Sequence, residues 1–68
     1  MSLPNLTQPE LMSLRENISA EMLMIEKFNT LAQQCSDSQL KQVLTSITST
    51  HEKHRDTLMR HLNDGNMM

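Results

Sequence analysis

The sequence predicts an all-α fold, an antiparallel two-helix hairpin that dimerises into a four-helix bundle. Three observations lead to this prediction. The single glycine, Gly65, and both prolines, Pro4 and Pro9, lie near the chain ends, so the middle of the chain is free of helix breakers. Two helix-start signals divide the chain, and apolar residues recur at alternating steps of three and four.

The first helix is expected over about residues 8–34. Thr7 can cap the helix, and Glu10, three residues later, completes a capping box. Pro9 falls in the first turn, where the missing N–H costs little.

A second start signal follows a turn expected at about residues 35–37. Ser36 and Gln39 repeat the capping pattern, and Asp37 adds negative charge that the helix dipole favours. The second helix is expected over about 37–62, before the sequence Asn63-Asp64-Gly65 and a flexible C-terminal tail. Because the connection is short, the two helices must lie antiparallel within one domain, residues 1–68.

A heptad seam runs along both helices in this prediction. It forms the bundle core through Leu11, Leu14, Ile18, Ile25, Phe28, Leu40, Leu44, Ile47 and Leu58. The polar exceptions are Glu21 on the first helix and three histidines, His51, His54 and His61, on the second. Folding about residue 36 sets Glu21 beside His51 and Phe28 beside Leu44, so polar residues of both helices meet at one level.

Further apolar residues flank the seam and widen the stripe beyond a two-helix contact: Met22, Met24, Leu31, Val43, Met59 and Leu62. Two helices cannot cover both flanks, and a chain of 68 residues buries little surface alone. We therefore expect a homodimer with two-fold symmetry.

Composition excludes several function classes. The formal net charge is -2, so no strong field attracts nucleic acid or an anionic membrane. No apolar run approaches the roughly 20 residues of a membrane span, and no secretory leader is expected. Cys35 is the only cysteine, so no disulfide forms within the chain. We interpret Cys35 as a small apolar residue near the turn.

Glu21, His51 and His54 are the candidate metal ligands. His51 and His54 share a helix face, and Glu21 faces them from the other helix. Three readings stay open: a divalent transition metal site, zinc or iron; a Glu–His hydrogen-bonded pair that fixes register; and a pH switch. His61, near the helix end, is expected to be a capping or solvated residue.

The stretch LTQPELMSLRENISAEMLMIEKFNTLAQQCSDSQLKQVLTSITSTHEKHRDTLMRHL resembles the short spore coat proteins of endospore-forming bacteria, the coat protein F type. The similar features are L-T-Q-x-E-L, K-F-N, S-D-x-Q-L-K and a late H-x-x-H-x-x-x-L-x-x-H-L. The resemblance implies a structural, non-enzymatic role in the coat, with other coat proteins as partners. It also implies synthesis in the mother-cell cytoplasm before assembly into the coat.

That family is similar in turn to the ferritin and rubrerythrin superfamily, in which a Glu and a Glu-x-x-His build a di-iron site inside a four-helix bundle. Glu21 matches the first Glu, Phe28 an aromatic seven residues on, and His54 the motif His. His51 replaces the motif Glu, and the nitrogen-richer set suits zinc, nickel or copper better than a di-iron centre. The alternative function is thus a small metal-binding protein, with a degenerate ferritin-like oxidase site as its enzymatic form.

Overall fold

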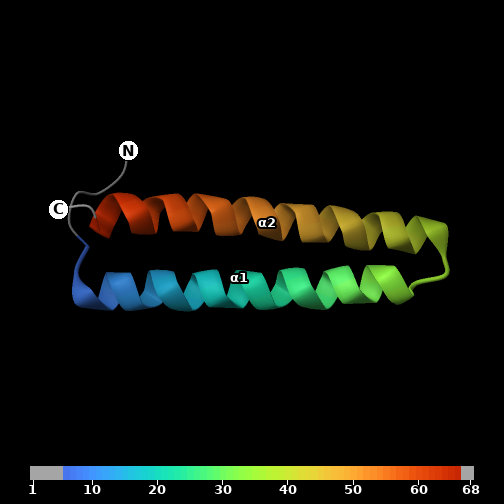
Figure 1. The fold of residues 1–68 in the computed structure, drawn as a ribbon, viewed down its shortest axis with the longest axis horizontal. Helices are drawn as coiled ribbons and strands as arrows, with labels where there is room; N and C mark the ends of the chain where they lie inside the picture. Colours follow the sequence, from blue (N-terminus) through green and yellow to red (C-terminus); the bar gives the residue numbers. More distant parts are fainter. Residues whose placement is uncertain (1–5, 67–68) are drawn as a thin grey trace.

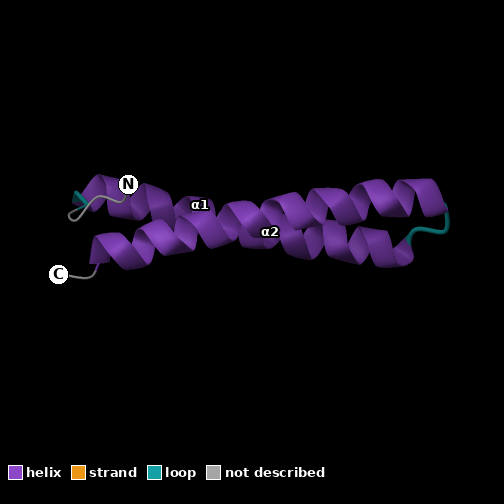
Figure 2. Cartoon of the chain, turned by 90° about the horizontal axis from the view of Figure 1, so that it is seen from above, coloured by secondary structure: helices purple, strands orange, loops and turns teal. Residues whose placement is uncertain are grey.

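The protein is a helical hairpin. The computed structural model describes residues 6–66, which form helix α1 (Gln8–Gln34) and helix α2 (Ser38–Asn66). The helices run antiparallel and side by side (Figure 1), and they cross each other when seen from above (Figure 2). The two-helix packing predicted from the sequence is confirmed, whereas the four-helix bundle concerns two chains and stays a prediction.

Helix α1 begins at the predicted capping box. The hydroxyl of Thr7 accepts a hydrogen bond from the backbone N–H of Glu10 at 3.2 Å, and the Glu10 carboxylate accepts one from the Thr7 N–H at 2.9 Å. The bond from the Thr7 N–H to the carboxylate is the main cause that holds the pKa of Glu10 below its ordinary value, and the Thr7 side chain acts in the same direction. Pro9 lies in the first turn.

Helix α2 begins differently from the prediction, because its capping side chain belongs to Asp37 and not to Ser36. The Asp37 carboxylate accepts a hydrogen bond from the N–H of Leu40 at 2.8 Å. An aspartate caps as well as a serine and adds its charge to the positive end of the helix. The helix consequently starts at Ser38, one residue later than expected.

The C-terminal end of α2 also differs from the prediction. The helix continues past Leu62 through Gly65 and ends at Asn66, and no glycine among the described residues has a positive φ. A glycine costs about 1 kcal/mol in a helix, which weakens the helix without ending it. The flexible tail therefore does not begin at residue 63, and residues 67–68 lie outside the described part.

The core is a thin layer between the two helices. Its best-buried members are Ile18 and Ala32 of α1 and Leu44 and Thr48 of α2, each 5–8% exposed. No side chain of the described residues is fully enclosed. The Cα atoms span 48 × 19 × 12 Å, so the molecule is one helix thick in its shortest direction.

The seam of α2 is offset from the predicted one. The residues facing α1 include Thr48 and Arg55, which were not predicted, whereas His54 is exposed and Leu40 is 50% exposed. Thr48 tolerates burial because its hydroxyl donates to the carbonyl of Leu44 at 2.9 Å. Arg55 can cover apolar surface with its aliphatic stem. Leu40 lies in the first turn of α2, opposite the end of α1.

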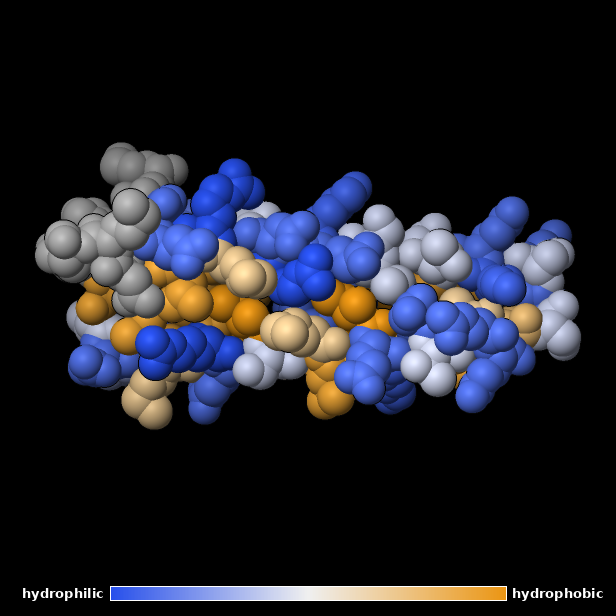
Figure 3. Space-filling view, viewed as in Figure 1, coloured by the Kyte–Doolittle hydropathy of each residue, from blue (hydrophilic) through white to orange (hydrophobic). Residues whose placement is uncertain are grey.

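Apolar side chains remain exposed on both sides of the hairpin. On the face in Figure 3 they follow the groove between the helices, and hydrophilic side chains lie outside them. The large apolar side chains with 39–65% exposure are Met12, Met22, Leu23, Met24, Leu31, Leu40, Val43 and Met59. Within residues 6–66, neither helix combines the length and hydropathy of a membrane span.

Candidate metal centre

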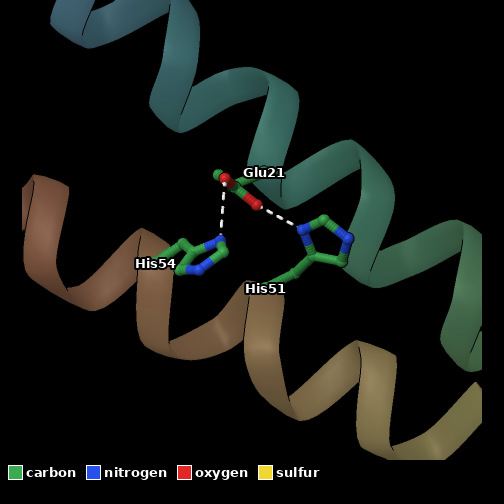
Figure 4. Close-up of side chains that lie close together, drawn as sticks. All are labelled: Glu21, His51 and His54. Atoms are coloured by element: carbon green, nitrogen blue, oxygen red, sulfur yellow. Dashed lines mark hydrogen bonds and ion pairs between the residues drawn. The ribbon is translucent and has the colours of Figure 1, made fainter.

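Glu21, His51 and His54 lie together halfway along the hairpin. Figure 4 shows Glu21 reaching from α1 toward both imidazoles of α2. Glu21 Oε1 is 2.5 Å from His51 Nδ1, and Glu21 Oε2 is 3.4 Å from His54 Nδ1. Donor atoms of the three side chains all lie within 4.8 Å of one another. Among the described residues, no other group of three or more such side chains is as close.

Helix geometry explains why these residues meet. His51 and His54 are one turn apart on α2, and their rings lie edge to face with centroids 5.9 Å apart. Glu21 continues the α1 seam between Ile18 and Ile25, so its side chain is directed at the partner helix. The side chain of Glu21 is 21% exposed, that of His51 25% and that of His54 55%. The centre therefore extends from the helix interface to the surface.

Phe28 supports the centre from one side. Its ring stacks on His51 with centroids 5.9 Å apart and an angle of 6° between the planes. The prediction placed Phe28 beside Leu44, and the stacking of Phe28 on His51 differs from that pairing. The contact between Glu21 and His51 is as predicted. The stacking contact was indicated in the sequence by Phe28 itself, the chain's single aromatic residue, which lies in the seam seven residues after Glu21. Stacking restricts the rotation of the His51 ring and aims Nδ1 at the carboxylate.

The hydrogen bond from His51 favours the ionised form of Glu21. It lowers the pKa of Glu21 below its ordinary value of 4.5, against the opposing effect of burial. The positive charge that His51 and His54 carry when protonated acts in the same direction. Because an ionised carboxylate can only accept hydrogen bonds, Nδ1 of His51 carries the shared proton. The site thus contains an acceptor of fixed negative charge near neutral pH.

The two carboxylate oxygens have different surroundings. Oε1 accepts the hydrogen bond from His51, and Oε2 lies beside the exposed His54. Two donor atoms on a tetrahedral zinc ion are about 3.3 Å apart. The 3.4 Å from Oε2 to His54 Nδ1 matches that spacing, and the 2.5 Å from Oε1 to His51 Nδ1 does not. The spacing of Glu21 Oε2 and His54 Nδ1 is therefore compatible with two ligands of one zinc ion, while His51 holds the other carboxylate oxygen.

Two other candidates of the sequence lie outside the centre. His61 is exposed and lines a surface hollow with Leu14 and Asn17 near the start of α1. Cys35 lies at the turn, where its thiol donates to the carbonyl of Asp37 at 3.4 Å. The structure therefore divides the three histidines into a pair and a separate surface residue.

Comparison with known proteins gives one informative match. The chain is 33% identical over 52 residues to the uncharacterised protein YuzM of Bacillus subtilis strain 168. The matched stretch covers 76% of this chain and 64% of the relative, so the chain spans less than two thirds of that protein's length. No family model and no solved structure matches the chain. The resemblance to the coat protein F type therefore still depends on its sequence motifs alone.

Proposed function

We propose that the chain is a non-enzymatic building block that acts by self-association as a helical bundle. One observation carries this proposal: among residues 6–66, eight large apolar side chains are at least 39% exposed and no side chain is fully enclosed. Two packed helices supply too little core for a comfortably stable monomer. A second copy removes part of this apolar surface from water and completes a core between four helices.

The resemblance to the coat protein F type supplies the biological setting of the proposal. A small, self-associating helical unit suits a protein layer such as the spore coat, with other coat proteins as neighbours. Immunodetection in purified coat fractions of a sporulating host tests this setting. Absence from the coat fraction, with the chain present in the mother cell, would overturn the coat role and leave self-association standing.

Light scattering on tag-free protein tests self-association directly. We expect a mass twice the 7.8 kDa of one chain at micromolar concentration. A folded, cooperatively unfolding monomer over the accessible concentration range would contradict the proposal. Circular dichroism on the same samples distinguishes a folded monomer from an unfolded chain.

A second candidate function is metal binding at Glu21, His51 and His54. Two imidazoles and a carboxylate within 4.8 Å form a donor set that suits zinc or iron. Metal content after purification without a histidine tag tests this candidate. A content below about 0.1 metal per chain, with no thermal shift on adding zinc or iron, would overturn it.

A further inference from the structure

The groove between the helices has two flanks, and only one contains the candidate metal centre. On α1, Asn17, Met24 and Leu31 are seven residues apart and form one stripe. On α2, the same spacing joins Leu40, Ile47, His54 and His61. Asn17 lines one surface hollow with His54 and another with His61, so both stripes lie on the same side of the hairpin. We call this side the Leu31 flank and the opposite side, with Met22 and Met59, the Met22 flank.

The Leu31 flank exposes more of its large apolar side chains near the turn than near the chain ends. Val43 lines a surface hollow with Ile47 and so lies on this flank too. Near the turn the flank exposes apolar side chains at 39–53%: Met24, Leu31, Leu40 and Val43. Toward the chain ends it exposes polar side chains, among them Asn17, Thr57 and His61. A second copy therefore buries the most apolar surface when the two turn halves face each other. A two-fold axis along the hairpin brings the turn halves together while the two hairpins overlap over their whole length, and both turns then lie at the same end.

The candidate metal centre lies at the boundary of these halves. Glu21 is the middle residue of α1, and His51 and His54 lie on either side of the middle of α2. A two-fold axis along the hairpin keeps each residue level with its copy. Docking through the Leu31 flank therefore brings the exposed His54 and the neighbouring Oε2 of Glu21 close to the same groups of the second copy.

We propose that two copies dock through the Leu31 flank and share one divalent transition metal ion on the two-fold axis. Glu21 and His54 of each copy supply four ligands, two carboxylate oxygens and two imidazole nitrogens, which meets the tetrahedral requirement of zinc. His51 keeps its hydrogen bond to Oε1 and acts as a positioning residue. The proposal depends on the self-association proposed above and adds the face, the stoichiometry and a metal-dependent affinity.

One carboxylate and one imidazole per chain explain why a single chain leaves the site incomplete. Glu21 Oε2 and His54 Nδ1 are already 3.4 Å apart, close to the spacing of two zinc ligands. Using His51 as a third ligand from the same chain requires the 2.5 Å contact to open by about 0.8 Å. Binding at the axis leaves that hydrogen bond intact.

Sedimentation equilibrium with and without zinc, together with zinc titration by calorimetry, tests the proposal. We expect one zinc per two chains and a dimer dissociation constant at least about tenfold lower with zinc. H54A should abolish this tightening, while H61A, which removes an exposed histidine of the same stripe, should keep it. H51A should weaken zinc binding by about 10–100-fold without changing the stoichiometry.

The face is tested by a matched pair of variants. L31E places a charge on the Leu31 flank, and M22E places one at a position of similar exposure, 52% against 46%, on the other flank. L31E should raise the metal-free dimer dissociation constant at least about tenfold, and M22E should change it less than threefold or so. The reverse ranking would overturn the choice of face.

The outcomes separate this inference from the proposed function. A wild-type dimer whose dissociation constant does not change with zinc overturns the shared site and leaves self-association standing. Binding of one zinc per chain without a change in mass overturns the shared site and leaves simple metal binding standing. A chain that stays a folded monomer with and without zinc overturns both proposals.

Discussion

The middle level of the helix interface and the layers on either side of it are built from different chemistry. Ile18, Ala32 and Leu44 form apolar layers that are 5–8% exposed. Between them, Glu21 and His51 pair through a hydrogen bond and remain about one fifth to one quarter exposed. Apolar layers contribute stability through surface removed from water, whereas a half-buried polar pair contributes little net stability. The comparison indicates that the apolar layers hold the hairpin together, and the middle level is where the proposed metal site lies.

The largest effect on stability is expected in an apolar layer. L44A should lower the free energy of unfolding by about 2–4 kcal/mol, because it removes most of a well-buried side chain. Urea denaturation at fixed protein concentration measures this loss. L23A, at a side chain that is 65% exposed on the outer face, is the control and should change stability by less than about 0.5 kcal/mol. Equal losses in the two variants would contradict the assignment of the core.

Converting the middle level into an apolar layer tests whether the polar pair contributes less to stability than apolar packing does. The double variant E21L/H51L replaces the polar pair with side chains that suit the seam. We expect a melting temperature equal to or above that of the wild type, because a buried polar pair is seldom more stabilising than apolar packing. Zinc should no longer shift the melting temperature. A clearly lower melting temperature would show that the pair itself stabilises the hairpin.

The dependence of the free energy of unfolding on acid pH is a further test of the Glu21–His51 pair. Because the pKa of Glu21 is lower in the folded chain than its ordinary value of 4.5, folding favours the ionised form. The stabilisation from this shift is complete above that ordinary value and disappears as the pH falls through the lowered value. E21Q lacks this contribution, so the stability difference between the wild type and E21Q should shrink as the pH falls below 4.5. A difference that stays constant or grows over this range would contradict the account.

The smallest effect is expected at Thr48, a polar residue inside an apolar layer. Its hydroxyl bonds to the carbonyl of Leu44 in its own helix, so the bond adds no contact between the helices. T48V keeps the side-chain shape and should change the free energy of unfolding by less than about 1 kcal/mol. Thermal unfolding checks this value. A loss above about 2 kcal/mol would mean that the hydroxyl has a further partner.

The sequence was sufficient for the hairpin because its signals are local. Thr7, Pro9 and Glu10 specify the start of α1, and the absence of glycine and proline from the middle leaves both helices uninterrupted. The end of α2 was mispredicted because Gly65 weakens a helix but need not end it. Whether a helix continues through a glycine depends on tertiary contacts, and the local sequence pattern does not show these contacts.

The candidate metal centre was predictable only in part. Glu21 and His51 interrupt the seam on opposite helices, and this coincidence indicated their contact. Thr48 and Arg55 face α1 although neighbouring residues of α2 are more apolar or stand out more in the sequence. Both can be buried, because the Thr48 hydroxyl has a hydrogen-bond partner and Arg55 has an aliphatic stem. Compared with the prediction, α2 is rotated about its own axis, and His54 therefore lies at the surface. A hydrophobic pattern ranks residues by type alone, so it does not detect a polar or charged side chain that can be buried in the seam.

The most direct test of the account is the mass of the tag-free chain measured by light scattering, with circular dichroism on the same sample. The account predicts a helical particle with twice the 7.8 kDa mass of one chain. A helical, cooperatively unfolding particle with the mass of one chain would contradict it, because the exposed apolar flanks would then need no partner.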